Sequence, residues 1–177
     1  MTVLLQTERL SLRRFTWDDV DNVLLISGDP DVMRYIGDGA VDDREGAKNR
    51  LARFMSHYEK YPGLGYWVAE KMSAREFIGW FALKYIPKTV EVEVGYLLRG
   101  SAWGHGFATE GAAALLAYGF DEIGLNRIVA VTHIENAASQ NVIKKIGLRD
   151  CGMGHYYDRD LAYFVAERQG FLSPKAR

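Results

Sequence analysis

One junction most strongly constrains what this chain can fold into. Alternating residues predict a β-strand over 89–98, and from Phe107 onward the apolar residues recur at helical spacing. The turn between these elements carries Gly104 and Gly106. A helix N-terminus presents unpaired N–H groups and the positive end of the helix dipole, so glycines there let an anion reach the main chain. The junction therefore predicts a phosphate site, although a glycine-rich connection without a ligand explains the local pattern equally well.

Two other phosphate-binding motifs do not fit this turn. A Rossmann fingerprint needs a third glycine where Thr109 stands. A P-loop needs a Gly-Lys-Ser/Thr sequence, which the chain does not contain. The turn therefore matches neither of these nucleotide-binding signatures.

The remaining segments read as further strands and helices. A first strand over 10–14 leads into a helix that Thr16 caps and that ends near Gly28. Further helices are predicted over 42–61 and over 137–146, the second capped by Asn136. The other predicted strands cover 65–71, 76–85, 127–132, 149–157 and 161–167. This order predicts an α/β fold with one mixed sheet and helices on both faces, antiparallel where the short connection at 72–75 joins two strands.

Length and charge favour one nearly neutral domain, which we expect to cover residues 1–177. The 22 Lys and Arg residues against 23 Asp and Glu give a net charge of -1, which argues against nucleic acid or membrane lipid as a partner. Charges interrupt the N-terminal apolar run before it reaches signal or spanning length, so we expect a cytoplasmic protein. Cys151 is the only cysteine, which excludes an internal disulfide and a multi-cysteine metal site. We expect a buried thiol there rather than a nucleophile.

Several motifs at consistent spacing resemble the GNAT acetyltransferases. They are Thr7-Glu8-Arg9-Leu10, Glu93-Val94-Gly95-Tyr96-Leu97-Leu98, Trp103 to Glu110, Gly124 to Ile128, and Glu135 through Leu148. The general family signature, Gln or Arg followed by x-x-Gly-x-Gly/Ala, maps onto Trp103, Gly106 and Ala108, with Trp in place of the leading polar residue. Within the family the chain is similar to the branch that acetylates ribosomal-protein N-termini, the RimJ/RimL-like enzymes.

The resemblance implies the GNAT fold, in which the central strands at 89–98 and 127–132 splay apart, and it implies acetyl-CoA as the cofactor. Backbone N–H groups would cradle the coenzyme A pyrophosphate at Gly104, His105, Gly106, Phe107, Ala108 and Thr109. Pantetheine would pair with the backbone around Leu97 and Leu98 and with Asn136, which equally suits the role of helix cap. Asn141 and Lys144 are further candidate contacts, and a solvated helix face explains them as well.

Acyl transfer from a thioester to an amine needs a neutral amine, a donor for the developing oxyanion and a proton for the departing thiolate. Glu93 matches a glutamate that often acts as the base in this family, although Glu91 shares its strand face. Ser139 matches a serine proposed to meet the coenzyme sulfur, and a first-turn hydroxyl that bonds to backbone is at least as good a reading. Many family members place the general acid near the C-terminal strands, where Tyr156 and Tyr157 are consecutive. Strand neighbours face opposite ways, and we expect Tyr156 to face the cleft.

The acceptor is less constrained. Asp38, Asp42 and Asp43 fall in the loop that walls the acceptor side in the family, which would suit a cationic amine, but a solvated acidic loop fits better. His133 follows the strand at 127–132 and serves as a polar cap more readily than as a catalyst. The branch implies a primary amine, a protein N-terminal α-amine ahead of an antibiotic, polyamine or amino acid. A non-catalytic coenzyme A-binding module is the rival reading, and both a monomer and a homodimer fit.

Overall fold

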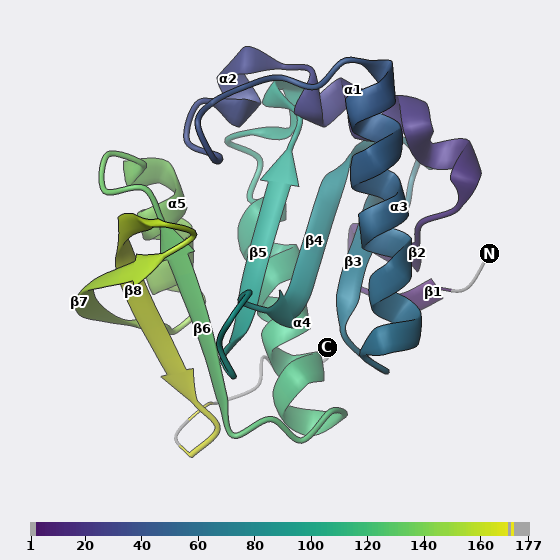
Figure 1. The fold of residues 1–177 in the computed structure, drawn as a ribbon. Helices are drawn as coiled ribbons and strands as arrows, with labels where there is room; N and C mark the ends of the chain where they lie inside the picture. Colours follow the sequence, from purple (N-terminus) through teal and green to yellow (C-terminus); the bar gives the residue numbers. More distant parts are fainter. Residues whose placement is uncertain (1–2, 170, 172–177) are drawn as a thin grey trace.

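The protein is built around one eight-stranded sheet with the strand order β1-β2-β3-β4-β5-β6-β8-β7 (Figure 1). The structure is a computed structural model that describes residues 3–169 and 171. The strands are β1 (Val3–Gln6), β2 (Leu10–Arg14), β3 (Gly65–Lys71), β4 (Phe77–Tyr85), β5 (Val92–Leu98), β6 (Arg127–Thr132), β7 (Arg149–Tyr156) and β8 (Arg159–Glu167). All neighbouring strands are antiparallel except β5 and β6, which run parallel.

Helices cover both faces of this sheet. On one face lie the 3₁₀ turn η1 (Trp17–Asp19) and the helices α1 (Val20–Ser27), α2 (Pro30–Met33) and α3 (Arg44–Lys60). On the other face lie α4 (Phe107–Asp121) and α5 (Ala137–Lys145), which follow the 3₁₀ turn η2 (Gly100–Ala102) and β6 respectively. Alternate residues of β3 and β4 therefore enter two different cores: Val68 and Trp80 pack toward α1 and α3, and Trp67 and Phe81 pack toward α4.

The two central strands diverge. Strand β5 pairs with β4 along its whole length, whereas β5 and β6 are joined in register only at Glu93 and Val129. Beyond that point the β6-facing edge of β5 is open, and the V-shaped gap widens toward Leu98. The expected GNAT fold, with its mixed sheet and splayed central pair, is confirmed.

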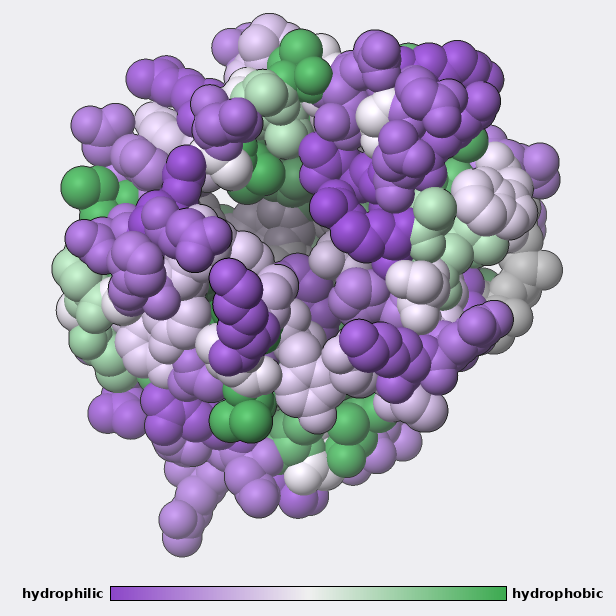
Figure 2. Space-filling view, viewed as in Figure 1, coloured by the Kyte–Doolittle hydropathy of each residue, from purple (hydrophilic) through white to green (hydrophobic). Residues whose placement is uncertain are grey.

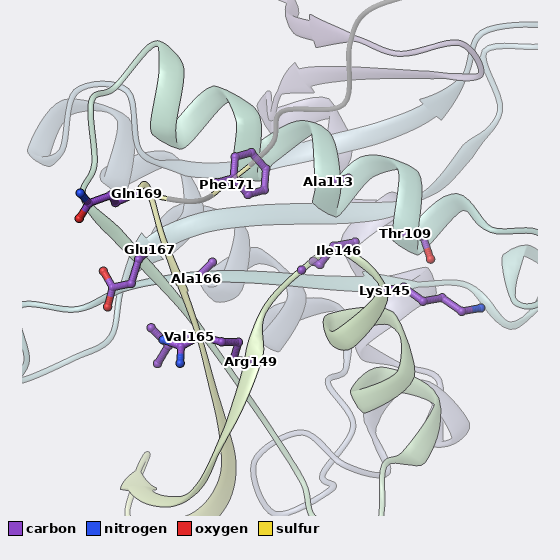
Figure 3. A pocket seen from close by; sticks show the side chains of 11 residues that line it. Thr109, Ala113, Lys145, Ile146, Arg149, Val165, Ala166, Glu167, Gln169 and Phe171 are labelled. Carbon is purple, nitrogen blue, oxygen red and sulfur yellow. The ribbon is translucent and has the colours of Figure 1, made fainter.

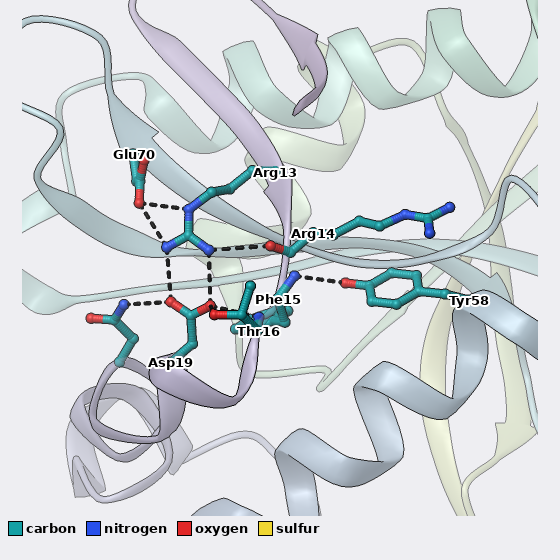
Figure 4. A network of polar contacts seen from close by, with 8 residues as sticks. Arg13, Arg14, Phe15, Thr16, Asp19, Tyr58 and Glu70 are labelled. Carbon is teal, nitrogen blue, oxygen red and sulfur yellow. Dashed lines mark hydrogen bonds and ion pairs between the residues drawn. The ribbon is translucent and has the colours of Figure 1, made fainter. Parts of the chain in front are cut away.

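A buried ion pair ties the first helical layer to the sheet (Figure 4). The guanidinium of Arg13 on β2 lies between the carboxylates of Asp19 in η1 and Glu70 on β3, and both nitrogen–oxygen distances are 2.8 Å. The Asp19 carboxylate also accepts from the backbone N–H of Thr16 at 2.8 Å. Arg13 and Asp19 are almost fully buried, so this network fixes where the chain leaves β2 and enters α1.

Most predicted elements are present, and the differences have local causes. Strand β5 begins at Val92 rather than at residue 89, because the Thr89 side chain accepts from the N–H of Glu91 inside the hairpin turn. The sequence reading did not identify β1 or the one-turn helix α2. The expected burial of Cys151 is wrong: its thiol is exposed, because β7 is an edge strand with solvent on both sides.

The prediction of a single domain over 1–177 stays a prediction, and its ends, residues 1–2 and 172–177, lie outside the described residues. Within the described part, no helix is long and apolar enough to cross a membrane. The same residues contain no cluster of His, Cys, Asp and Glu side chains suited to a metal ion.

Candidate active site

The glycine turn before α4 is open and left-handed. Gly104 and Gly106 have φ angles of 76° and 82°, which residues with a side chain rarely adopt. A Cβ atom placed on Gly104 would meet nothing within 4 Å, so the outer side of the turn is free. The first helical hydrogen bond of α4 runs from Glu110 N to Gly106 O, at 3.0 Å. The N–H groups of residues 107–109 precede it and remain available to an anion, together with the positive end of a 15-residue helix.

Trp103 occupies the position at which the general family signature has a polar residue. Its indole N–H donates to the carbonyl of Leu98 at 2.8 Å, and this bond closes the segment between β5 and the glycines. The ring itself is half exposed. Trp103 therefore bonds to the backbone of the segment that leads into the turn.

The splayed strands leave a cleft beside β5. Figure 2, drawn from the same side as Figure 1, shows the surface hollowed between β5 and α5, beneath the connection from α2 to α3. Across the gap, the hydroxyl of Tyr96 lies 3.3 Å from Ser139 Oγ, so β5 and the first turn of α5 meet there. Burial raises the pKa of Tyr96 to about 12, which keeps its phenol protonated. Asn136 accepts from the N–H of Ser139 at 3.0 Å, which confirms its role as the cap of α5.

A three-residue cluster lies where the cleft closes. Glu93 on β5 is buried, and its Oε2 is 2.7 Å from the ammonium of Lys84 on β4. The phenol of Tyr157 donates to the same oxygen, and Lys84 Nζ lies 2.5 Å from that phenol. Among the described residues none donates to Glu93 Oε1, so this oxygen is free for a water or an amine. We call Lys84, Glu93 and Tyr157 the acid–base cluster.

The electrostatics of the acid–base cluster separate the roles of its members. Burial opposes the charged form of Lys84, but Glu93, Tyr66 and Tyr157 together outweigh it, so the pKa of Lys84 lies above its ordinary value. Burial, and then the adjacent Glu93 carboxylate, raise the pKa of Tyr157 above its ordinary value. At neutral pH Lys84 is thus a cation and Tyr157 a neutral phenol, and Glu93 is the member able to accept a proton.

Of the two consecutive tyrosines, Tyr157 reaches Glu93 and Tyr156 does not. Tyr156 instead donates to Glu91 Oε2 at 2.5 Å and stacks on Tyr163, which donates to the other Glu91 oxygen. The strand alternation expected for this pair does not apply, because β7 ends at Tyr156 and Tyr157 turns out of the strand at a φ of 54°. The catalytic role expected of Tyr156 stays a prediction, and of the two tyrosines only Tyr157 contacts Glu93.

The two remaining cofactor candidates on α5 are both exposed. Asn141 is exposed, and Lys144 pairs with Asp150 at 3.5 Å. The next residue, Lys145, instead lines a pocket of about 610 Å³ between α4, α5 and β8, which Thr109 also borders. Figure 3 shows Thr109 and Lys145 together at one end of this pocket and Phe171 toward the other. Thr109 therefore lies both in the segment predicted to cradle the pyrophosphate and at the edge of a cavity that Lys145 lines.

The acidic residues of the α2–α3 loop have local structural roles. Asp42 pairs with Arg50 at 2.6 Å, Asp43 caps α3 by accepting from the N–H of Gly46, and Asp38 accepts from the N–H of Ala40. These contacts agree with a structural acidic loop. His133 stacks on a ring from the same loop, that of Tyr35, with the ring centres 5.2 Å apart.

Sequence reasoning did not identify Lys84 as a member of the site. Its signal was present in the β4–β5 hairpin, because Lys84 and Glu93 are direct cross-strand partners. Recognising this pair requires the register of the β4–β5 hairpin, but the sequence analysis predicted the start of β5 three residues too early. Lys145 was missed for a different reason, since on a helix face only the packing decides which of two adjacent lysines meets the cavity.

Comparison with known proteins agrees with this geometry. The acetyltransferase (GNAT) domain family matches residues 9–149. The chain is 30% identical over 158 residues to the uncharacterized N-acetyltransferase YoaA of Bacillus subtilis, covering 89% of each chain. It is also 30% identical over 152 residues to the FsC-acetyl coenzyme A-N(2)-transacetylase of Aspergillus fumigatus, covering 81% of this chain and 64% of that protein.

Solved structures show the same fold. A GNAT-family acetyltransferase from Bacillus anthracis superposes with a TM-score of 0.80 at 26% identity, covering 96% of this chain and 99% of that one. The RimL ribosomal L7/L12 alpha-N-protein acetyltransferase in complex with coenzyme A superposes with a TM-score of 0.78 at 16% identity, covering 93% and 97%. The chain belongs to the GNAT acetyltransferases and is an acetyl-CoA-dependent N-acetyltransferase.

Proposed function

We propose that the protein transfers the acetyl group of acetyl-CoA directly to a primary amine held beside Glu93, and that its acceptor is a protein N-terminal α-amine. The observation that carries this proposal is the arrangement along one strand. The open glycine turn follows the end of β5, and the acid–base cluster lies near the start of the same strand, where β6 separates from it. Cofactor and proton acceptor thus have places at opposite ends of one cleft.

The residues of the cleft fit coenzyme A. The free N–H groups between Gly104 and Thr109 would hold its pyrophosphate, and the open edge of β5 at Leu97 and Leu98 would pair with pantetheine. The cofactor supplies the activated acyl group as a thioester. Ser139 lies on the cleft wall opposite β5, in reach of the neutral phenol of Tyr96, and a hydroxyl there would protonate the departing thiolate.

The acid–base cluster would handle the proton of the amine. The amine nitrogen forms a bond to the carbonyl carbon, the carbon–sulfur bond breaks, and the amine proton passes to Glu93, directly or through water on Oε1. Lys84 stays charged and holds Glu93 in place, and Tyr157 fixes the same oxygen from the β7–β8 turn. Glu93 is thereby kept at a single orientation toward the cleft.

The α-amine preference follows from how much deprotonation the site must achieve. At pH 7 an amine with a pKa of about 10.4, such as lysine, is neutral in roughly one molecule in two thousand, and an α-amine near 8 in about one in ten. Glu93 is a single carboxylate, and one of its two oxygens is already occupied. It is therefore better suited to an acceptor amine that needs less deprotonation. The structural likeness to RimL, named as an alpha-N-protein acetyltransferase, supports the same choice.

Coenzyme A release in the presence of acetyl-CoA and a panel of acceptors tests this proposal. The panel contains peptides with free N-termini, N-blocked lysine peptides, polyamines and aminoglycosides. We expect the highest kcat/KM with the free N-termini. A higher value for the lysine peptides, or release with none of the peptides, would contradict the α-amine assignment and leave the acetyltransferase class intact.

A small-molecule amine is the second candidate. It is favoured by the Aspergillus fumigatus relative, whose name describes transfer to an N(2) position of FsC. Preferential turnover of a polyamine, aminoglycoside or amino acid in the same panel would select it.

A further inference from the structure

The first turn of α4 carries a negative charge beside the proposed phosphate site. Glu110 lies in that turn, one turn after Gly106. A carboxylate there suits the helix dipole, but it also repels an anionic ligand at the same helix end. An unpaired Glu110 would therefore oppose binding of a pyrophosphate.

Residues of the motif Thr7-Glu8-Arg9-Leu10, which we call the opening motif, bind this carboxylate and neutralise its charge. Thr7 Oγ donates to Glu110 Oε1 at 2.5 Å, and the backbone N–H of Arg9 donates to the same oxygen at 2.9 Å. Arg9 Nε donates to Glu110 Oε2 at 2.6 Å. Burial opposes ionisation of Glu110, but these bonds outweigh it and hold the pKa of the carboxyl below its ordinary value. Both carboxylate oxygens are thus engaged on the side of β2.

The same arginine also holds the glycine turn. Arg9 Nη1 donates to the carbonyl of His105 at 3.0 Å, and its Cζ lies 4.6 Å from the centre of the Phe107 ring. A trans peptide is planar, so its C=O and N–H groups point in opposite directions. Because the His105 carbonyl points toward Arg9, the N–H of Gly106 points away from it, out of the turn. The contact therefore sets the direction of an N–H in the proposed cradle.

We propose that Thr7, Arg9 and Glu110 are positioning residues that hold the glycine turn before α4 in its binding geometry before the cofactor arrives. This inference rests on the proposed placement of the pyrophosphate on residues 104–109. It gives the opening motif a role in cofactor affinity although none of its side chains has to touch the cofactor.

The test measures the Kd of coenzyme A by calorimetry, and kcat and the KM for acetyl-CoA, in Arg9→Gln and Glu110→Gln. We expect the Kd and the KM to rise about five- to tenfold in each, as for the loss of a charge-assisted hydrogen bond, with kcat within about twofold of the wild type. The double variant should bind no more weakly than the worse single variant, because both changes release the same turn.

Glu110→Gln separates positioning from simple charge. If Arg9 acted only as a nearby cation, removal of the Glu110 charge would leave the cation unpaired and tighten coenzyme A binding. Tighter or unchanged binding in Glu110→Gln therefore overturns the proposal, as does wild-type affinity in Arg9→Lys, which keeps the charge but loses the fork that reaches His105.

Two further variants complete the experiment. Asp21→Asn breaks the exposed pair of Asp21 and Arg44 between α1 and α3 and should leave the Kd unchanged, which controls for general loss of an ion pair. Gly106→Ala strains the turn itself at a φ of 82°. If Gly106→Ala weakens coenzyme A binding and Arg9→Gln does not, the positioning role is wrong. If neither variant weakens binding, the proposed placement of the pyrophosphate on this turn is itself wrong. Thermal melts of each variant show that it is folded.

Discussion

Glu93 and Lys84 face each other across the antiparallel pair of β4 and β5, with carboxylate and ammonium 2.7 Å apart at the point where the sheet begins to open. Their side chains are only 10% and 14% exposed, so the pair is largely shielded from water. A buried ion pair contributes little stability by itself, and it is costly to break. Its position at the closed end of the cleft is what makes it informative about the reaction.

Glu93→Gln removes the proton acceptor and keeps the shape of the side chain. We expect kcat to fall by about 10²-fold or more, the usual contribution of a general base, with little change in the Kd of coenzyme A. Single-turnover rates and calorimetry on the same preparation separate the two quantities. A rate within about threefold of the wild type would show that the amine loses its proton elsewhere.

Lys84→Met leaves the Glu93 carboxylate buried without its cation. We expect the free energy of unfolding to fall by about 2 to 3 kcal/mol, somewhat less than for a fully buried pair because Tyr157 still donates to Glu93. Urea denaturation measures the loss. Adding Glu93→Gln to Lys84→Met should restore part of it, and simple additivity of the two changes would mean that the residues do not interact.

Tyr157→Phe and Tyr156→Phe form a matched pair of adjacent changes. Tyr157 donates to Glu93 and Tyr156 to Glu91, so we expect only Tyr157→Phe to lower kcat, by about fivefold to tenfold for one hydrogen bond to a charged group. Steady-state kinetics on both variants decide the question. A larger loss of kcat in Tyr156→Phe would instead support the catalytic role expected of Tyr156.

The pH dependence of kcat/KM should follow the acceptor. Because the pKa values of Lys84 and Tyr157 lie above their ordinary values, both groups keep their protons to higher pH than usual, and neither titrates between about pH 6 and 9. With an α-amine acceptor the rate should rise with pH and level off near about 8, and with a lysine acceptor it should keep rising to about 10. Profiles for two peptides that differ only in the free amine test this, and one midpoint shared by both would assign the titration to the enzyme.

The fold was largely predictable because its strongest signals are local. The change from alternating to helical spacing at Phe107 and the cap at Asn136 depend on a few neighbouring residues, and both were confirmed. The positions of the two tyrosine side chains could not be predicted from neighbouring residues in this way. Tyr157 reaches Glu93 only because the turn after β7 adopts a left-handed conformation, and two consecutive tyrosines do not reveal which one leaves the strand.

The contacts of Arg9 show the same limit. The motif Thr7-Glu8-Arg9-Leu10 was visible in the sequence, but its partner Glu110 lies 101 residues from Arg9 along the chain. Neither the period of α4 nor the charge of Arg9 indicates that these two residues meet. The two segments meet only in the fold, where the turn before β2 lies against the first turn of α4.

The buried pair of Arg13 and Asp19 predicts how the protein responds to acid. Burial works against the ionised form of Asp19, but hydrogen bonds from Arg13, Thr16 and Asn22 outweigh it, so its pKa in the folded state lies below the ordinary 3.8. A depressed pKa means that the unfolded chain takes up the proton first. The stability from this group is therefore complete above the unfolded value and is lost as the pH falls through the folded one.

Asp19→Asn tests that assignment. At pH 7 we expect a loss of about 3 kcal/mol in the free energy of unfolding, at the low end for a broken buried pair because Glu70 still contacts Arg13. The difference from the wild type should shrink as the pH is lowered below about 4, where the unfolded wild-type chain becomes protonated. Asp21→Asn, which breaks an exposed pair, should cost less than about 1 kcal/mol at every pH. Denaturant titrations between pH 7 and about pH 3 measure all three proteins, and a constant gap between wild type and Asp19→Asn would show that folding leaves the pKa of Asp19 unchanged.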